Sequence, residues 1–158
     1  LILARLIGYK NIDLAVRAFT RAGKPLVIIG EGSHRAALEA LAGPDVRFLG
    51  RLSEAEMSHW LERCRALVFP GEEDFGITPV EAMACGKPVI AFGRGGALET
   101  VRDGETGVFF DLPKEEALLE AVARCEAIRW DRAVIRQQAE QFSEAVFLER
   151  TERLLRQR

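Results

Sequence analysis

Two glutamates, Glu73 and Glu81, with seven residues between them, lie in the part of the chain richest in possible chemistry. The stretch 69–92 predicts a strand, an acidic loop that contains glycine, a helix from about Thr78 to Cys85, and a second buried strand. This order places carboxylates and free backbone amides together at the carboxyl edge of a parallel sheet. An α/β protein holds a phosphorylated ligand at such an edge.

Glu81 has two interpretations that the pattern weighs equally. Thr78 can be the N-cap of the helix, with Pro79 at the first helical position and Glu81 at the third, which is a capping box. In that case Glu81 bonds back to the Thr78 amide. The alternative is a ligand role, since the unpaired amides of Gly76, Ile77 and Thr78 at the positive end of the helix favour an anion.

Glu73 has no comparable structural role. It follows a buried strand, in a loop that also carries Glu72 and Asp74. Carboxylates bind sugar hydroxyls well through charge-assisted hydrogen bonds, so a hydroxyl-rich group beside a phosphate would explain an acid here. Glu72 and Asp74 are predicted to be solvated loop charges.

Two cations, Arg5 and Lys10, follow the first predicted strand. Together they can neutralise a diphosphate that carries no bound metal. Either one alone would be interpreted as an ordinary surface cation.

Strands alternate with helices along the chain, which predicts an α/β fold. We expect a Rossmann-like, doubly wound parallel six-stranded sheet in the order 3-2-1-4-5-6, with helices on both faces and further helices after Lys114. Strands one and four then lie side by side, and loops 6–11 and 70–77 meet at the point where the strand order reverses. The expected strands are 1–6, 24–29, 46–49, 66–69, 88–92 and 107–110, and Asn11 and Ser53 are expected to begin helices.

Glycines follow two of these strands, as Gly30-Glu31-Gly32 and as Gly93-Arg94-Gly95-Gly96. Either group could let the backbone approach a ligand closely, although a pair of glycines is a weak signal. The dinucleotide-binding fingerprint is missing, which disfavours a nicotinamide dehydrogenase.

Composition restricts the class of protein further. A chain of 158 residues with 48% hydrophobic content is the size of one globular domain, and a net charge of −2 gives no reason to expect a nucleic-acid partner. The three cysteines are widely spaced and predict neither a disulfide framework nor a metal site, so the cytoplasm is the expected location. Because the chain opens inside a core strand without Met, we expect a further N-terminal part.

The run Glu73 to Ile90 resembles the E-x7-E signature of retaining family 4 glycosyltransferases with the GT-B fold. The segments 95–101 and 103–107 are similar to the part that follows in those enzymes. Ala4-Arg5-Leu6 with Lys10-Asn11 resembles the family's basic opening of the C-terminal domain, although the family often has glycine where this chain has Ala4.

The resemblance implies that residues 1–158 are the C-terminal donor-binding domain, whose partner, the N-terminal acceptor domain, is absent. It implies transfer of a sugar from a nucleotide-diphospho-sugar with retention of configuration and without a metal or other cofactor. The resemblance also implies roles for the matched residues. Glu73 would contact the sugar, the backbone of Phe75, Gly76, Ile77 and Thr78 would bind sugar and phosphate, and Arg5 and Lys10 would bind the diphosphate. Glu81 would bind the ribose, Leu52 would lie near the base pocket, and Gly30 and Gly32 would lie near the nucleotide.

Residues 73–77, in the form Glu-Asp-Phe-Gly-Ile, together with residues 92–99 resemble most the mannosyltransferase members. This favours GDP-mannose as the donor in polysaccharide or glycolipid biosynthesis. The acceptor would be a glycan or lipid, and the full-length protein could associate with the inner membrane face. Two other functions stay open: a sugar-nucleotide-binding module without turnover, and a relative of the GT-B epimerases or phosphorylases.

Overall fold

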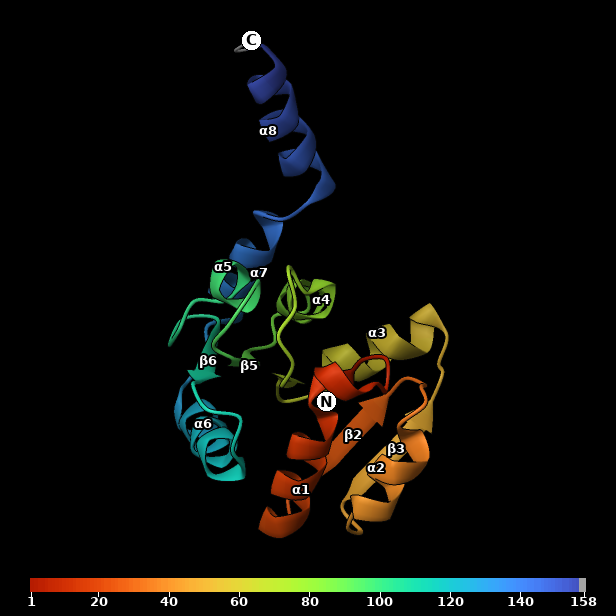
Figure 1. The fold of residues 1–158 in the computed structure, drawn as a ribbon. Helices are drawn as coiled ribbons and strands as arrows, with labels where there is room; N and C mark the ends of the chain where they lie inside the picture. The colour runs from red at the N-terminus through yellow and green to blue at the C-terminus, as the bar shows by residue number, and fades with distance from the viewer. Residues whose placement is uncertain (157–158) are drawn as a thin grey trace.

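The computed structural model describes residues 1–156 and shows strands alternating with helices (Figure 1). The strands are β1 (Ile2–Leu3), β2 (Leu26–Ile29), β3 (Val46–Gly50), β4 (Leu67–Phe69), β5 (Val89–Phe92) and β6 (Gly107–Phe110). The helices are the 3-10 turn η1 (Gly8–Lys10), α1 (Ile12–Ala22), α2 (Arg35–Leu41), α3 (Glu54–Arg63), α4 (Ile77–Ala84), α5 (Ala97–Thr100), α6 (Glu115–Ala127), α7 (Arg132–Glu140) and α8 (Glu144–Arg156).

All strand pairs are parallel, in two three-stranded sheets of order β1-β2-β3 and β4-β5-β6. The sheets meet at β1 and β4, where the Leu1 amino group donates to the Ala66 carbonyl at 3.1 Å and the Val68 amide donates to the Leu1 carbonyl at 2.8 Å. Across these two contacts the strands follow the order 3-2-1-4-5-6, but the single six-stranded sheet expected from the sequence is wrong, because β1 spans only Ile2–Leu3 and forms no regular ladder with β4. The predicted α/β fold class, with β1 beside β4, is confirmed.

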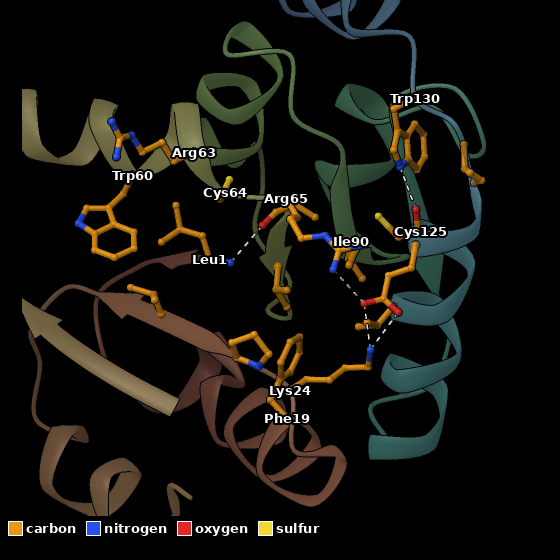
Figure 2. Close-up of a pocket in the computed structure, with 17 residues that line it drawn as sticks. Leu1, Phe19, Lys24, Trp60, Arg63, Cys64, Arg65, Ile90, Cys125 and Trp130 are labelled. Atoms are coloured by element: carbon orange, nitrogen blue, oxygen red, sulfur yellow. Dashed lines mark hydrogen bonds and ion pairs between the residues drawn. The ribbon is translucent and has the colours of Figure 1, made fainter. Parts of the chain in front are cut away.

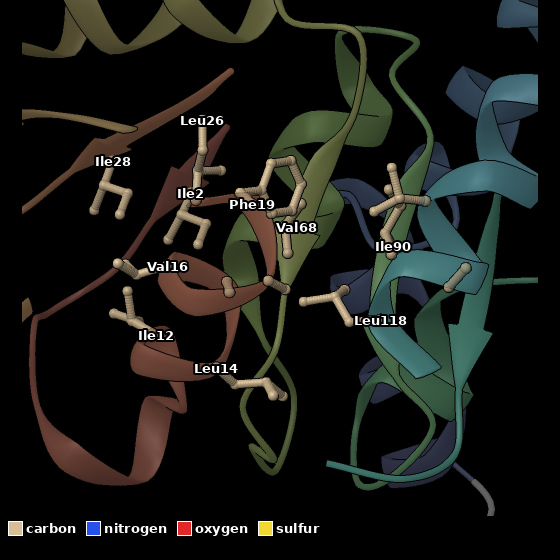
Figure 3. Packing of buried hydrophobic residues seen from close by; sticks show 14 of the residues in the cluster. Ile2, Ile12, Leu14, Val16, Phe19, Leu26, Ile28, Val68, Ile90 and Leu118 are labelled. Atoms are coloured by element: carbon tan, nitrogen blue, oxygen red, sulfur yellow. The ribbon is translucent and has the colours of Figure 1, made fainter. Parts of the chain in front are cut away.

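Buried side chains fill both faces of the strands. On one face Ile2, Ile28 and Ile90 pack with the residues of α1 and α6, as the sticks in Figure 3 show. The next residues along two of these strands, Leu3 and Ile29, belong to a second cluster. That cluster covers the opposite face with residues of α4 and α7. Helices cover both faces, as expected for strands made of continuous apolar runs.

Helix α3 begins as the sequence predicted. The Ser53 hydroxyl accepts from the Glu56 amide at 3.3 Å, and the Glu56 carboxylate accepts from the Ser53 amide at 2.8 Å. This is the capping box expected from the two residue types at this spacing.

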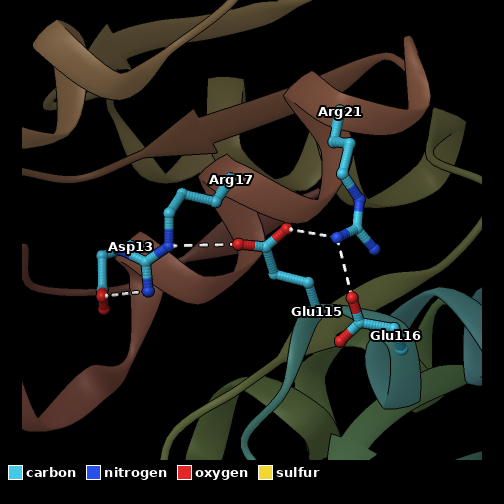
Figure 4. A network of polar contacts seen from close by, with 5 residues as sticks. All are labelled: Asp13, Arg17, Arg21, Glu115 and Glu116. Carbon is cyan, nitrogen blue, oxygen red and sulfur yellow. Dashed lines mark hydrogen bonds and ion pairs between the residues drawn. The ribbon is translucent and has the colours of Figure 1, made fainter.

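Helices α1 and α6 are joined across the two halves of the molecule by ion pairs (Figure 4). Arg21 contacts Glu115 at 3.1 Å and Glu116 at 2.8 Å, and Arg17 contacts Glu115 at 3.4 Å. Arg17 also pairs with Asp13 one turn earlier at 2.8 Å. These side chains link the first three strands to the last three on the outside of the core.

Helix α8 extends away from the strands, at the blue end of Figure 1. It buries none of its side chains, and Phe147, Leu148, Leu154 and Leu155 are exposed. Across residues 1–156 there is no helix with the length and apolar character needed to cross a membrane.

Candidate functional site

The two loops predicted to meet at the carboxyl edge of β1 and β4 do meet. The side-chain amide of Asn11 donates to the Pro70 carbonyl at 3.4 Å. A Cβ added to Gly71 would lie 2.9 Å from the Lys10 Cα, so only glycine lets the loop after β4 lie this close to η1. Asn11 is the N-cap residue of α1, as expected, but at φ 51 its side chain makes no cap bond and reaches the neighbouring loop instead.

Lys10 and Glu73, which are 63 positions apart in the sequence, form an ion pair and hydrogen bond at this edge. Their side chains are only 14% and 24% exposed. The Lys10 ammonium also lies 5.1 Å from the centre of the Tyr9 ring. The structure thus brings together one of the two predicted cations and the predicted sugar-binding carboxylate.

Arg5 lies in the same loop as Lys10, and its side chain is exposed. Within the described part of the chain its guanidinium forms no ion pair and no hydrogen bond. The backbone around it is fixed, since the amides of Ala4 and Leu6 donate to the carbonyls of Ile29 and Glu31 at 3.1 and 2.9 Å. Arg5 therefore makes no polar side-chain interaction with residues 70–78 in the described structure.

The predicted capping box at Thr78 is wrong. Helix α4 begins at Ile77, its N-cap is Gly76 at φ 80, and no side chain caps this end. The physical reason is that glycine adopts a positive φ without steric cost, so the chain turns into the helix two residues before Thr78. A Cβ on Gly76 would lie 2.8 Å from Cζ of Phe69. Thr78 and Pro79 then occupy the first turn, where a proline is tolerated.

No side chain of the described residues caps the start of α4. The first amides of the helix have neither an intrahelical acceptor nor a side-chain cap, which leaves a positive, donor-rich end beside the acidic loop. Glu81, predicted as the possible capping partner, is an exposed residue that caps nothing. Desolvation of its carboxyl group raises its pKa above the usual value.

Gly95 and Gly96 lie against the backbone of the acidic loop. The Gly96 amide donates to the Glu73 carbonyl at 2.7 Å. Gly95 has φ +62, and a Cβ there would lie 2.4 Å from the Glu73 carbonyl oxygen. A Cβ on Gly96 would lie 2.4 Å from the Asp74 carbonyl oxygen. The sequence pattern marked these glycines only as a weak signal, yet they determine where the Glu73 backbone lies.

Glu72, Asp74 and Phe75 of this loop are exposed, which confirms the expectation for the two acids. The Phe75 ring packs edge-on against Phe142, with ring centres 5.7 Å apart. Phe75 and the exposed Ile77 give the opening of α4 an apolar border next to its free amides.

Gly30, Gly32 and Leu52 have identifiable structural surroundings. A Cβ on Gly30 would lie 1.8 Å from the Ala4 carbonyl oxygen, and one on Gly32 would lie 2.3 Å from that of Leu6. These glycines therefore let the loop after β2 lie against the backbone that carries Arg5. Leu52 is half-buried after β3 and packs against the second core cluster.

A cavity of about 450 Å³ lies at the opposite edge, where the strands begin (Figure 2). Its lining includes Leu1, Trp60, Cys64, Cys125 and Trp130. The cysteines are free, and burial raises the pKa of Cys125 to about 11. Among residues 1–156 no group of three or more His, Cys, Asp and Glu side chains is arranged to hold a metal ion.

Comparison with known proteins identifies the family of the chain. The family model "Glycosyl transferases group 1" matches residues 1–142. The chain is 51% identical over 63 residues to the alpha-1,3/1,6-mannosyltransferase ALG2 of Dictyostelium discoideum, covering 39% of this chain and 15% of that protein. It is 36% identical over 114 residues to a GDP-mannose-dependent monoacylated alpha-(1-6)-phosphatidylinositol monomannoside mannosyltransferase of Corynebacterium glutamicum, covering 62% and 30%.

Among solved structures, the apo form of the lipopolysaccharide outer core galactosyltransferase WaaB matches with a TM-score of 0.84 at 20% identity, over 96% of this chain and 46% of that one. This likeness concerns the fold. The chain spans less than half the length of each of these relatives. The match of the family model to residues 1–142 bears out the resemblance seen in the sequence, and the chain belongs to the group 1 glycosyltransferase family.

Proposed function

We propose that this chain is the donor-binding part of a retaining glycosyltransferase and that it binds a nucleotide-diphospho-sugar at the edge shared by β1 and β4. The observation that carries the proposal is the meeting of Lys10 and Glu73 beside the uncapped start of α4. A cation, a carboxylate and free helix amides at one sheet edge suit a ligand that is anionic at one end and hydroxylated at the other.

The binding roles follow the ligand from end to end. Lys10, Arg5 and the amides of Gly76, Ile77 and Thr78 bind the diphosphate, and Glu73 accepts hydrogen bonds from the sugar hydroxyls together with the Phe75 backbone. Glu81 accepts from the ribose hydroxyls. Leu52 borders the base, and Gly30 and Gly32 hold the Arg5 loop near the nucleotide. The positive charge that a metal would otherwise provide comes from the two cations and the helix end.

In the complete enzyme the bond between the sugar's anomeric carbon and the phosphate oxygen breaks, and a bond to the acceptor oxygen forms on the same face. The acceptor's hydroxyl proton passes to the departing phosphate oxygen. Negative charge accumulates on the leaving nucleoside diphosphate, where Arg5, Lys10 and the α4 amides already stand. The acceptor, a glycan or lipid, is bound by a part of the protein outside this chain.

GDP-mannose is the donor we favour. In support, the mannosyltransferases of Dictyostelium and Corynebacterium are among the relatives, and the second is named as GDP-mannose-dependent.

Thermal-shift titration of this chain with GDP-mannose, UDP-glucose and UDP-N-acetylglucosamine tests the proposal. A true donor raises the melting temperature further with each increase in concentration above its dissociation constant. We expect the largest rise with GDP-mannose. A melting temperature unchanged by all three ligands contradicts a donor site on this chain. Transfer is then assayed on the full-length protein, where binding without turnover would identify a binding module.

A further inference from the structure

Lys10 and Glu73 are already paired with each other in the structure without a ligand. The pair is mostly shielded from solvent, and in the described residues Lys10 has no ion-pair partner other than Glu73. The neighbouring acids Glu72 and Asp74 are exposed and form no ion pair within residues 1–156. A ligand that takes Lys10 must therefore displace the carboxylate of Glu73.

A displaced Glu73 carboxylate stays within one side chain's length of its backbone, which is held in place beside Lys10. Its backbone carbonyl accepts from Gly96 at 2.7 Å, and the close approach of Gly71 to Lys10 fixes the other side of the pair. After a diphosphate binds Lys10, Glu73 stays near the phosphates as an unpaired negative charge. Like charges at short range repel, and an unpaired charge with little solvent is costly.

We propose that this pair makes the site discriminate between an intact sugar donor and the free nucleoside diphosphate. This inference rests on the proposed donor site. An intact donor replaces both halves of the pair, because its diphosphate takes Lys10 and its sugar hydroxyls donate to Glu73. A free nucleoside diphosphate replaces only one half and leaves Glu73 facing the phosphates. The spent product consequently binds weakly and leaves, while the substrate is retained.

Isothermal titration calorimetry at fixed ionic strength tests the inference with GDP and GDP-mannose as ligands. The proteins are the wild-type chain, Glu73→Gln, Glu73→Ala as a second variant without the carboxylate, and Glu72→Gln as the control. Glu72 is the residue before Glu73, and its side chain is exposed and forms no ion pair in the described structure. Glu72→Gln therefore removes the same formal charge without breaking an ion pair. Melting curves establish that each variant is folded.

We expect wild type to bind GDP-mannose more tightly than GDP. Both Glu73 variants should bind GDP about fivefold or more tighter than wild type, since loss of a partly buried ion pair of about 1 kcal/mol frees Lys10. They should also lose the preference for the sugar donor, and Glu72→Gln should behave as wild type.

The inference fails if the Glu73 variants bind GDP no tighter than wild type, or if Glu72→Gln tightens GDP binding equally. If either result occurs while wild type still binds GDP-mannose, the discrimination is refuted and the donor site stands. If wild type binds neither ligand, nor the corresponding uridine nucleotides, the donor site and the discrimination both fall.

Discussion

Arg5 and Lys10 were predicted as a pair, and the structure separates their situations. Lys10 is engaged by Glu73, whereas the exposed Arg5 has no partner within residues 1–156. A cation without a competing carboxylate can bind a diphosphate without first breaking an ion pair. Arg5 is therefore the cation whose full binding energy is available to a ligand.

Replacing Arg5 by alanine should weaken donor binding about 10- to 100-fold, the equivalent of one charge-assisted contact of roughly 1.5–3 kcal/mol. Transfer by the full-length enzyme should fall at least as far, while the melting temperature stays within about 2 °C because the side chain is exposed and forms no ion pair or hydrogen bond within residues 1–156. Arg47→Ala, a change at an exposed arginine on β3, serves as the control. Equal donor affinity in the two variants would remove Arg5 from the site.

Cys125 provides a test that does not depend on the donor site. Burial raises the pKa of its thiol to about 11, above the unfolded value of about 8.5. Because the thiolate is the reactive form, alkylation of Cys125 by iodoacetamide should be slow at pH 8 in the native protein and fast in urea. Peptide mass spectrometry gives the alkylation rates, and equally rapid native labelling at pH 8 would argue against burial.

The raised pKa of Cys125 also affects stability. Since the folded pKa is the higher one, the free energy of unfolding should fall as the pH rises from about 8.5 towards 11.

The loop between β4 and α4 depends on an element that follows it in the sequence. The turn after β5 accommodates the acidic loop only because Gly95 and Gly96 have no side chains. From the sequence alone, glycines after a strand are possible points of close approach to a ligand. In the structure their contact is with the backbone of Glu73 and Asp74, which gives them an indirect effect on any ligand that Glu73 binds.

Gly95→Ala should therefore weaken donor binding more than tenfold, because its Cβ would displace the Glu73 carbonyl oxygen that lies 2.4 Å away. Gly104→Ala is the matched control: its φ is also positive, at +77, but nothing lies within 4 Å of the added Cβ. Both variants should lose about 1–2 kcal/mol of stability from the left-handed backbone, measured by urea unfolding, and Gly95→Ala should lose more because its Cβ also meets the Glu73 carbonyl oxygen. Calorimetry should find a weaker donor affinity in Gly95→Ala and an unchanged donor affinity in Gly104→Ala. If the two variants bind the donor equally weakly, backbone strain alone explains the loss.

The elements were predictable where burial dictated them. Runs such as Leu26 to Ile29 must be covered on both faces, and strand–helix alternation leaves few alternatives to a parallel sheet whose order reverses between β1 and β4. The start of α4 was not predictable, since Thr78-Pro79-Val80-Glu81 fits a capping box and nothing in the pattern reveals the positive φ of Gly76. Local preference was overridden there by the packing of Gly76 against Phe69.

The site was predictable as a location and only partly as a set of contacts. Topology alone placed Lys10 and Glu73 at one sheet edge. Their direct pairing and the side-chain contact from Asn11 to Pro70 depend on how closely the two loops approach each other. Gly71 permits this approach because it has no side chain. No spacing rule relates residues about sixty positions apart, so these contacts became visible only in three dimensions.

The two halves of the molecule meet along β1 and β4 and along the α1–α6 ion pairs of Figure 4. The hydrogen bond from Arg21 lowers the pKa of Glu116 below its ordinary value. Since the folded pKa is the lower one, this contribution to stability is present above the unfolded pKa of Glu116 and is lost as the pH falls through the folded value.

Glu116→Gln should accordingly reduce the acid-induced loss of stability between about pH 5 and pH 3, measured by urea unfolding at each pH. The effect should be small, because the pair is exposed and screened by salt. Glu120→Gln is the control, as Glu120 is exposed on the same helix and forms no ion pair in residues 1–156. Identical pH dependence in the two variants would show that the Arg21–Glu116 contact contributes nothing in solution.

Within residues 1–156, the edge where Lys10 and Glu73 meet and the cavity at the opposite edge are separate places where a ligand could bind. Hydrogen–deuterium exchange of the chain with and without saturating GDP-mannose distinguishes them directly. We predict that the ligand slows exchange in segments 5–11 and 71–80 and leaves segments 60–66 and 122–130 unchanged. Slower exchange confined to the cavity segments, with none in 5–11 and 71–80, would contradict a donor site at the meeting of β1 and β4.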